Sequence, residues 1–485
     1  SVVFAGFSAK SLSERINDSE CKIVITSDFS HRGNKVINLK SIVDKAIETS
    51  SCVEKVIIVK TGVDNIKINN NRDVFLHDEI LKVDNIRPAE VMESEDPLFI
   101  LYTSGSTGKP KGILHTTAGY MVYAQYSFMN VFQYEKNDIF WCTADVGWIT
   151  GHTYLIYGPL LAGSTIMMFE GIPTWPNASR FWEIVDKHKV NIFYTAPTAI
   201  RALQAKGNSF LKGYNLDSLK VLGSVGEPIN IEAWQWYYEF IGKKKCPIVD
   251  TWWQTETGGI MISALAGITE LKPTYATLPL PGIKPVIVDD NGDIIKENNK
   301  EGYLCIDFPW PSMLRTIYGD HERCQKTYFS TFEKKYFTGD ACKRDENGYY
   351  RIIGRVDDVI NVSGHRLGTA EIENAINLHD KVVESAVIGF KHEIKGQGIY
   401  AFIILKDKKD DNIKKEIISI VNKEIGAIAK PDFIQIVYNL PKTRSGKIMR
   451  RILRKIADGE KENFGDTSTL LDPSVVKEII KNRLT

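Results

Sequence analysis

The sequence has 485 residues, which suffices for about three domains of ordinary size or for one large domain and a smaller one. Hydrophobic residues make up 43% and charged residues 25%, the balance of a soluble globular protein. The 61 basic and 60 acidic residues leave a formal net charge of +1. This excludes a global attraction to nucleic acid or to an anionic membrane, so any anion-binding site must be built locally.

The 7 cysteines include no C-x-x-C pair, and their number is odd. We therefore expect free and mostly buried thiols in a reducing compartment, the cytoplasm. The chain opens on residues 2–6 (VVFAG), which is typical of a strand already inside a domain. We expect that an N-terminal part of the domain precedes Ser1, and this leaves a nuclear or organellar address open. The most apolar stretch, residues 153–169, contains glycine and proline and indicates a buried strand–turn–strand rather than a membrane span.

Up to about residue 355, short apolar runs alternate with helical patterns. The pattern predicts strands at Cys21–Ser27, Lys55–Val59, Leu98–Tyr102 and Asn191–Tyr194, and a helix at 178–189 that Asn177 caps. This alternation favours α/β layers with largely parallel strands. Between residues 282 and 353, short β runs separated by Asn-Gly and Glu-Gly turns indicate a small antiparallel sheet or barrel.

From about residue 357 the pattern is that of a separate small α+β unit. It predicts helices at Thr369–Asn377 and Ile413–Ile425 and strands at Val382–Phe390 and Ile399–Leu405. The predicted fold class is α/β, with a large N-terminal domain (1–356) of layered sheets plus a small β-barrel and a smaller, mobile α+β domain (357–485). The basic run 447–455 (KIMRRILRK) favours an amphipathic helix with a solvated basic face, with phosphate binding as the alternative.

A string rich in glycines and hydroxyls, residues 102–112 (YTSGSTGKPKG), directly follows a predicted strand. Glycines let backbone N–H groups approach an anion, and the hydroxyls and lysines supply further donors. The string is not a Walker A loop, because Pro110 after Lys109 forbids the helix that such a loop begins. It predicts an anion-binding loop of another kind.

This string resembles the phosphate loop of the adenylate-forming superfamily, which comprises acyl-CoA synthetases, peptide-synthetase adenylation domains and luciferases. Further motifs of that superfamily follow in the expected order: DTWWQTETG at 250–258, YFTGD at 336–340, GRVDD at 354–358, SGHR at 363–366 and PKTRSGK at 441–447. The resemblance is strongest to the acetyl-CoA synthetases, and it covers essentially the whole chain. It implies a ligase that uses ATP and Mg²⁺ to join acetate to coenzyme A through acetyl-AMP, releasing AMP and pyrophosphate. A propionyl- or other short-chain acyl-CoA synthetase is one alternative, and a non-catalytic nucleotide-binding or scaffold protein is another.

The resemblance also implies a role for individual residues. The catalytic residues would be Lys447, Glu256 and Thr103. Glu256 would also hold the Mg²⁺ that ATP brings. The ATP and AMP site would comprise Gly226, Glu227, Pro228, Asp250, Thr251, Trp252, Trp253, Gln254, Thr255, Asp340, Arg355 and Arg366. Asp340 would accept hydrogen bonds from the ribose hydroxyls, and the two arginines would contact ribose and phosphate oxygens. A cation such as Lys447 at ~4 Å from the reacting phosphate would contribute on the order of 4 kcal/mol at an effective dielectric near 20.

The acetate pocket would be formed by Ile149, Thr150, Val225 and Trp253, with the tryptophan closing the pocket just beyond a methyl group. Coenzyme A would contact Gly6, Arg32, Gly33, Asn34, Lys35, Thr150, Thr174, Ala196, Ser363, Gly364 and Asn422. Residues among these depart from the family pattern: Lys35 and Asn422 replace arginines, and Thr174 replaces an asparagine. A second metal site would involve Asn377, His379 and Val382, although His379 also fits an ordinary histidine at a helix end.

The resemblance implies motion and regulation as well. The C-terminal domain would rotate about a hinge at Asp357 between the two half-reactions, exchanging Lys447 for the Ser363-Gly364 loop. Acetylases and deacetylases would act on Lys447, because acetylation removes its charge. We expect no nucleic-acid or membrane partner, and the sequence does not fix the oligomeric state.

Overall fold

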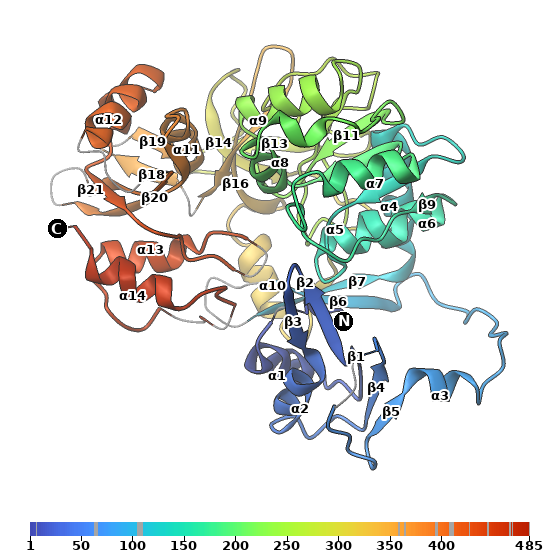
Figure 1. Cartoon of the computed structure of the whole chain (residues 1–485). Helices are drawn as coiled ribbons and strands as arrows, with labels where there is room; N and C mark the ends of the chain where they lie inside the picture. Colours follow the sequence, from blue (N-terminus) through green and yellow to red (C-terminus); the bar gives the residue numbers. More distant parts are fainter. Residues whose placement is uncertain are drawn as a thin grey trace. The chain divides into compact units, whose positions relative to one another are not determined.

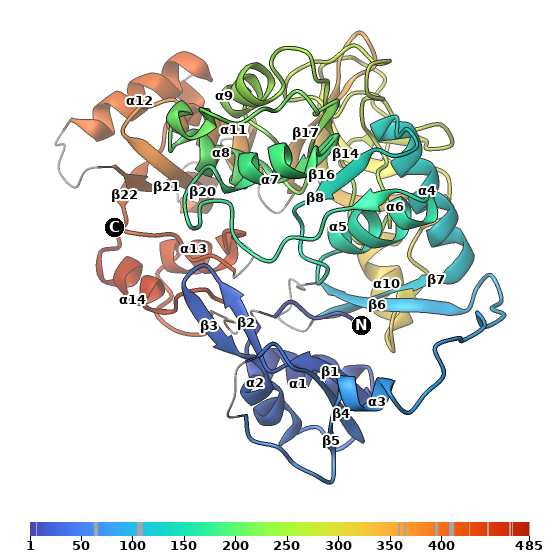
Figure 2. The same ribbon diagram turned by 45° about the vertical axis from the view of Figure 1, so that its right-hand side comes forward.

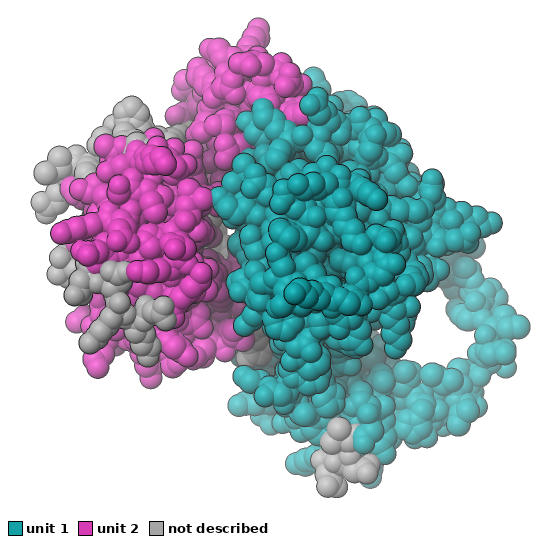
Figure 3. All heavy atoms as spheres, turned by 45° about the horizontal axis from the view of Figure 1, so that its top comes forward, with its two compact units in different colours: residues 1–284, 308–331 teal, residues 285–307, 332–485 magenta. Residues whose placement is uncertain are grey.

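The computed structural model describes the chain except residues 6, 63–65, 104–109, 357–358, 363–364, 393–395, 407–411, 426, 444–445, 465–466, 468 and 485. At 359, 361, 365, 366, 396 and 428 it describes the backbone alone. The described residues form two units, residues 1–284 with 308–331 and residues 285–307 with 332–485 (Figure 3). The boundaries of these units differ from the domain boundary that the sequence predicts between residues 356 and 357. The predicted domain boundary stays a prediction.

The first unit begins with a three-stranded parallel sheet in the order β1 (Ile23–Ser27), β4 (Lys55–Val59), β5 (Asp73–Phe75). The amphipathic helices α1 (Ala9–Asp18) and α2 (Leu39–Ile47) cover this sheet and bury Ile16 and Val43 with strand residues Val56 and Ile58. The predicted strands at Cys21–Ser27 and Lys55–Val59 are confirmed, the first of them from Ile23 onward. Also in this region are the hairpin β2 (Phe29–Arg32) and β3 (Lys35–Asn38) and the short α3 (Leu76–Ile80).

The central sheet of the first unit has five parallel strands. Their order is β12 (Ile248–Asp250), β11 (Val221–Ser224), β10 (Ile192–Thr195), β8 (Ile139–Cys142) and β9 (Thr165–Ile166). Every residue of β10 and β11 is buried, as expected for parallel strands that are covered on both faces. The predicted strand at Asn191–Tyr194 is therefore confirmed, shifted by one residue.

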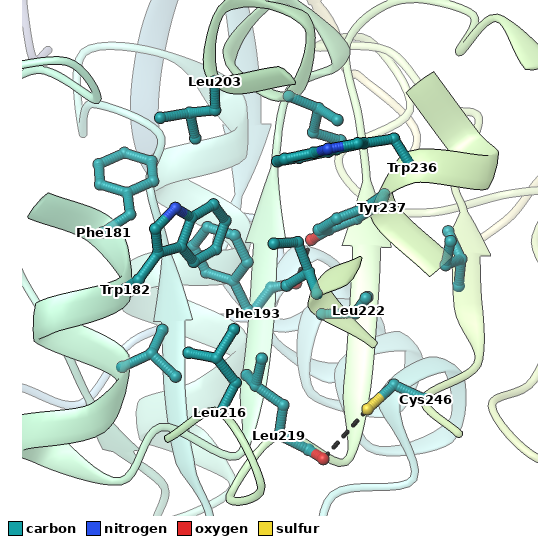
Figure 4. Close-up of a cluster of buried hydrophobic side chains, with 14 of the residues drawn as sticks. Phe181, Trp182, Phe193, Leu203, Leu216, Leu219, Leu222, Trp236, Tyr237 and Cys246 are labelled. Atoms are coloured by element: carbon teal, nitrogen blue, oxygen red, sulfur yellow. Dashed lines mark hydrogen bonds between the residues drawn. The ribbon is translucent and has the colours of Figure 1, made fainter. Parts of the chain in front are cut away.

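One face of this sheet packs on a large aromatic core. Phe193 of β10 meets Phe181 and Trp182 of α7 (Arg180–His188) and Tyr237 of η3 (Tyr237–Ile241), as Figure 4 shows. Helices α8 (Pro197–Gln204) and α9 (Ile231–Trp236) complete this layer, and α7, α8 and α9 lie together in Figures 1 and 2. A short η2 (Asn208–Leu211) follows α8.

The opposite face packs on α4 (Thr117–Phe132). Because side chains alternate along a strand, Tyr194 points away from its neighbour Phe193. Its ring lies 5.0 Å from that of Phe132 on α4, and Phe140 of β8 lies 4.9 Å from Phe128. The two faces of the central sheet are thus both aromatic, and Tyr194 belongs to the α4 face.

Residues 153–169 are mainly helical, so the predicted strand–turn–strand is wrong. The segment contains the π-helical η1 (His152–Tyr157) and α6 (Gly158–Leu161), which directly follow α5 (Ile149–Gly151), and only β9 is a strand. Proline is tolerated in the first turn of a helix, where Pro159 lies, and here it marks the start of α6 rather than a turn. A buried helix is apolar on all sides, so hydrophobicity alone does not separate it from a strand.

A second prediction in this unit is corrected at α7. The helix begins at Arg180, and its N-cap position is Ser179, whose side chain makes no capping bond. The Asn177 carboxamide oxygen accepts from the backbone N–H of Ser179 at 2.9 Å. Asn177 therefore shapes the turn before the helix instead of capping it.

An antiparallel sheet of β6 (Pro97–Thr103), β7 (Lys111–Thr116) and β15 (Thr316–Ile317), in the order β15-β7-β6, completes the first unit together with α10 (His321–Tyr328). Strand β6 confirms the strand predicted at Leu98–Tyr102. The register pairs Thr103 with Lys111, so the two ends of the glycine-rich string lie in β6 and β7.

The second unit contains two sheets. One is a four-stranded antiparallel sheet with β13 and β17 at its edges. Its strands follow the order β13 (Pro285–Val288), β14 (Glu301–Ile306), β16 (Tyr336–Arg344) and β17 (Tyr350–Arg355). The turns in this region predict a sheet or a barrel, and the predicted fold class names the barrel. The described strands form an open sheet instead, because the edge strands β13 and β17 pair with β14 and β16 and not with each other. The other sheet has the order β19 (His365–Gly368), β18 (Val359–Val362), β21 (Gly396–Leu405), β20 (Val382–His392), with β22 (Phe433–Ile436) paired to β21.

Alternating residues of β20 and β21 build one core on each face of the second sheet. Val387 and Ala401 pack with α11 (Thr369–Asn377) and α12 (Ile413–Glu424). Ile388 and Phe402 pack with α13 (Arg450–Ala457) and α14 (Ser474–Lys481). The helices predicted at Thr369–Asn377 and Ile413–Ile425 and the strands predicted at Val382–Phe390 and Ile399–Leu405 are confirmed. A short η5 (Ala427–Ala429) follows α12.

The basic run 447–455 is only partly helical. Helix α13 begins at Arg450, so Lys447 precedes it. Ile452, Leu453 and Ile456 are fully buried, which confirms the amphipathic reading for the helical part.

Five of the seven cysteines are buried and none is in a disulfide, as the sequence predicts. Among the described residues, we find no helix with both the length and the apolar character needed to cross a membrane.

Candidate active site

The carboxyl ends of three central strands carry most of the predicted nucleotide residues. Strands β10, β11 and β12 end at Thr195, Ser224 and Asp250, and Ala196, Val225–Pro228 and Thr251–Thr255 follow them directly. The Val225 N–H donates to the Thr195 carbonyl at 3.2 Å, and the Thr251 N–H donates to the Ser224 carbonyl at 3.0 Å. The three segments are thus tied at one edge of the sheet, which is where open α/β sheets bind their ligands.

Two carboxylates at this edge differ in electrostatic environment. Burial raises the pKa of Asp250 to about 7, and the hydroxyl of Ser224 offsets this only in part. Burial also opposes ionisation of Glu227, but the Arg201 guanidinium 2.8 Å away and the N–H and hydroxyl of Thr198 outweigh it. The pKa of Glu227 is therefore held below its usual value, and this side chain is an ion-pair partner that faces α8.

The indole of Trp253 is held between two buried tyrosines. Its ring lies 4.9 Å from that of Tyr154 in η1, with the two planes perpendicular, and its N–H donates to the Tyr194 hydroxyl at 3.3 Å. Of the other predicted pocket residues, Val225 is buried after β11, and the half-buried Ile149 and Thr150 begin α5, directly before η1. Ile149 also packs beside Phe99 and Tyr120.

The predicted metal ligand Glu256 lies in a charged cluster within the first unit. Its carboxylate accepts a hydrogen bond from Tyr328 of α10 and lies 3.5 Å from the ammonium of Lys111 on β7. The same ammonium donates to the Tyr328 hydroxyl at 2.6 Å. Both charged side chains are largely buried, at 14% and 12% exposure, so this is a desolvated pair bridged by a phenol. A carboxylate at this place has the hard oxygen atoms that Mg²⁺ prefers.

A fully buried histidine anchors the backbone next to Glu256. His115 of β7 bonds the Thr255 carbonyl through Nε2 at 2.7 Å. A carbonyl only accepts, so Nε2 carries the proton. Burial lowers the pKa of His115 to about 4, which keeps the ring neutral at neutral pH. The side chain therefore fixes the position of the 255–256 peptide without adding charge.

The predicted catalytic Thr103 ends β6, opposite Lys111 of β7. Its hydroxyl is buried and has no hydrogen-bond partner within the described part of the chain. Because buried polar groups are normally hydrogen-bonded, this hydroxyl is a candidate contact for a ligand. Residues 104–109 of the glycine-rich string lie outside the described residues.

In the second unit, Asp340 and Arg355 face each other across β16 and β17. The Arg355 guanidinium lies 3.6 Å from the Asp340 carboxylate and donates to the Thr338 carbonyl at 2.9 Å. Gly339 has a φ of +71°, and a Cβ there would lie 2.6 Å from the guanidinium. Glycine therefore leaves the space that Arg355 occupies. The structure joins these two predicted nucleotide residues in one ion pair.

Lys447 is exposed and ends a tight turn. The Thr443 N–H donates to the Lys447 carbonyl at 2.8 Å, and the Lys447 N–H donates to the Thr443 hydroxyl at 3.1 Å. Gly446 has a φ of +89°, in the left-handed region that favours glycine. The turn holds the lysine backbone in a defined place and leaves its long side chain at the surface of the second unit.

The predicted coenzyme A residues are spread over several elements. Gly33 and Asn34 form the turn of the β2–β3 hairpin, between the exposed Arg32 and Lys35. This turn contacts the segment that contains Thr174, since a Cβ on Gly33 would lie 3.3 Å from Ile172 Cδ1. Ala196 precedes α8, and Asn422 is exposed on α12 in the second unit.

The proposed second metal site also lies in the second unit. His379 is buried, its Nε2 lies 2.8 Å from the Glu416 carboxylate, and its Nδ1 accepts from the Lys381 N–H at 3.2 Å. The Asn377 carboxamide oxygen accepts from Ser385 at 2.8 Å. The imidazole is thus engaged at both nitrogens, so a metal here would have to rely on carbonyl oxygens. The described residues contain no cluster of three or more His, Cys, Asp or Glu side chains suited to a metal.

Comparison with known families identifies the chain. Residues 1–318 match the family of the AMP-binding enzymes, and residues 371–447 match the AMP-binding enzyme C-terminal domain. The chain belongs to the AMP-binding enzyme family.

Relatives of this AMP-binding enzyme carry a more specific name. It is 57% identical to an acetyl-coenzyme A synthetase of Saccharophagus degradans and 58% identical to one of Bradyrhizobium diazoefficiens. Each match covers 100% of this chain and 75% of the relative. Among solved structures, an acetoacetyl-CoA synthetase from Streptomyces lividans superposes with a TM-score of 0.87 at 22% identity, covering 98% of this chain and 72% of that one. This last likeness concerns the fold alone.

Several predicted site residues of this AMP-binding enzyme are not placed by the structure. Gly6, the hinge Asp357 and the Ser363-Gly364 loop lie outside the described residues, and of Arg366 only the backbone is described. Their roles stay predictions.

Other residues at the site lie outside the set that the motifs predict. Lys111 belongs to the quoted string, so its charge offered a signal. His115, Tyr154, Tyr194 and Tyr328 lie in no recognised motif, and only the fold shows that they contact the segment 253–256.

Proposed function

We propose that this AMP-binding enzyme ligates acetate to coenzyme A. The acetate carboxylate attacks the α-phosphorus of ATP, pyrophosphate leaves, and the thiol of coenzyme A then displaces AMP from acetyl-AMP. The observation that carries this proposal is the 57–58% identity, over the entire chain, to relatives named acetyl-coenzyme A synthetase. The arrangement around Trp253 supports the choice of a short acid, because an indole held from two sides leaves little freedom for a longer chain.

In this proposal, each group of predicted site residues would have a separate role in the reaction. Thr251–Thr255 would contact the nucleotide at the sheet edge, and Asp340 would accept hydrogen bonds from the ribose with Arg355 beside it. Glu256 would hold Mg²⁺, which neutralises phosphate charge when it is bound. Lys447 would bring a cation to the first half-reaction, when the negative charges of acetate and ATP meet.

Motion and regulation belong to the same proposal. A rotation about Asp357 would remove Lys447 after adenylation and present Ser363-Gly364 for thioester formation. The exposure of Lys447 supports access by acetylases and deacetylases. The free and mostly buried cysteines support a reducing compartment such as the cytoplasm.

The test compares acids from acetate to valerate in two assays, ATP–pyrophosphate exchange and formation of the coenzyme A thioester. Acetate should give the highest kcat/KM in both assays. A higher kcat/KM for propionate or a longer acid would favour the short-chain alternative. Absence of acid-dependent exchange with every acid would contradict the proposal.

A further inference from the structure

The indole N–H of Trp253 donates to a residue that the predicted pocket does not include. Its acceptor is the hydroxyl of Tyr194, 3.3 Å away on β10. The Tyr194 side chain is fully buried, and burial raises the pKa of its phenol well above the usual range, so the hydroxyl keeps its proton.

The hydrogen bonds from this hydroxyl have a fixed direction. The Tyr194 and Thr251 hydroxyls lie 2.7 Å apart, and the Thr251 hydroxyl also lies 2.9 Å from the Ser224 carbonyl. A carbonyl only accepts, so Thr251 gives its hydrogen to Ser224 and must accept from Tyr194. An indole N–H only donates, so Tyr194 accepts from Trp253. The result is an ordered chain from Trp253 through Tyr194 and Thr251 to the end of β11, next to Val225.

Packing leaves the Tyr194 ring little alternative. A Cβ on Gly223 would lie 2.4 Å from Tyr194 Cδ2, so β11 approaches the ring as closely as only glycine permits. Phe132 contacts the ring at 5.0 Å and Tyr154 at 5.9 Å between centroids. Tyr154 is itself fixed, since its hydroxyl accepts from the Ile260 N–H at 2.6 Å and its ring touches Trp253. Tyr194 is therefore a rigid anchor for the indole.

We propose that Tyr194 is a positioning residue that sets the acyl chain length accepted by the enzyme, by holding Trp253 in the orientation that closes the pocket. This inference rests on the proposed function. It predicts that the Tyr194 hydroxyl contributes to selectivity between acids without contacting any substrate. Loss of the hydroxyl removes one of the two contacts that hold the indole and leaves the packing on Tyr154, so the ring rotates more readily and admits a longer acid.

The test measures the ratio of kcat/KM for acetate to that for propionate in Tyr194→Phe, which keeps the ring and removes the hydroxyl. The ratio should fall roughly fivefold, the effect of one buried neutral hydrogen bond. The matched control is Tyr237→Phe, an equally buried tyrosine whose hydroxyl lies 3.2 Å from the Phe193 carbonyl and 3.4 Å from the Gly223 carbonyl, and which bonds none of the side chains of Trp253, Tyr194 and Thr251. Its ratio should stay at the native value, because general loosening of the core lowers kcat/KM for both acids alike.

A double-mutant cycle separates positioning from other effects. In the Trp253→Gly background, Tyr194→Phe should change the ratio no further, because the group it positions is gone. If Tyr194→Phe does not accumulate as folded protein, Thr251→Val interrupts the chain one step later and should lower the ratio in the same direction.

The outcomes distinguish the two proposals. If the native enzyme activates no short acid, the proposed function fails. If the native enzyme prefers acetate and Trp253→Gly relaxes that preference, but Tyr194→Phe keeps the native ratio, the proposed function stands and the role of Tyr194 is refuted. An equal change in the ratio in Tyr194→Phe and Tyr237→Phe also refutes it.

Discussion

Replacing Trp253 by glycine should shift the enzyme from acetate toward longer acids. The change removes the ring that lies 4.9 Å from Tyr154 and the N–H that bonds Tyr194, and it leaves the space of an indole beside these two tyrosines. Each methylene that enters such a space gains about 0.8 kcal/mol from burial, which is about fourfold in kcat/KM. Propionate should therefore gain about fourfold over acetate, and butyrate more than tenfold.

The stability cost of this change is limited by its position. A fully buried tryptophan costs about 3–5 kcal/mol when it is truncated, and Trp253 is only half-buried, so the cost should lie below that range. Thermal melting checks that the variant is folded. Trp253→Phe is the matched control, because it keeps a ring against Tyr154 but lacks the N–H, and its preference should lie between those of the native enzyme and Trp253→Gly.

The assay is kcat/KM for thioester formation with acetate, propionate, butyrate and valerate. If folded Trp253→Gly keeps the native order and ratios, Trp253 does not close the pocket and the reasoning is refuted.

Three further predictions concern other parts of the site. Lys447→Ala should abolish acetate-dependent ATP–pyrophosphate exchange and largely spare thioester formation from supplied acetyl-AMP; equal loss of both would contradict its role. Asp340→Asn should raise the KM for ATP about tenfold, with the KM for acetate unchanged, because a charge-assisted hydrogen bond is worth roughly 1.5–3 kcal/mol; equal changes in both constants would argue against ribose binding. Burial lowers the pKa of His115 from 6.5, its value in the unfolded chain, to about 4 in the folded protein. The neutral buried ring therefore stabilises the folded protein fully above pH 6.5, and this stabilisation is lost as the pH falls toward 4. Native protein should lose about 3 kcal/mol over that interval relative to His115→Gln in urea titrations, and parallel curves for the two proteins would contradict this.

The fold was predictable wherever hydrophobic periodicity and length agree. Lys55–Val59 and Thr369–Asn377 match β4 and α11 residue for residue, because each has one buried face and clear ends. The pattern of residues 153–169 predicts strands where the structure has a helix, because that helix is buried on most sides and has no polar face to mark the helical period. The helix predicted from Lys447 begins at Arg450, since the preceding residues form the turn that closes on Thr443.

In the candidate site, only the residues that belong to a recognisable motif could be predicted from the sequence. Glu256, Asp340 and Trp253 stand in recognisable strings, so a resemblance identifies them. Tyr194 and Tyr328 come from a core strand and a surface helix that are distant in sequence from Trp253 and Glu256. The role of Tyr194 follows from its hydroxyl lying beside the indole nitrogen of Trp253, and that of Tyr328 from its hydroxyl lying beside the carboxylate of Glu256. The sequence alone does not show that these side chains are in contact.

The most direct test of the account is ATP–pyrophosphate exchange by the native enzyme, with and without acetate, followed by addition of coenzyme A. The account predicts exchange that depends on acetate and formation of acetyl-CoA with AMP in equal amounts. Exchange that is independent of acetate, or formation of ADP in place of AMP, would contradict it.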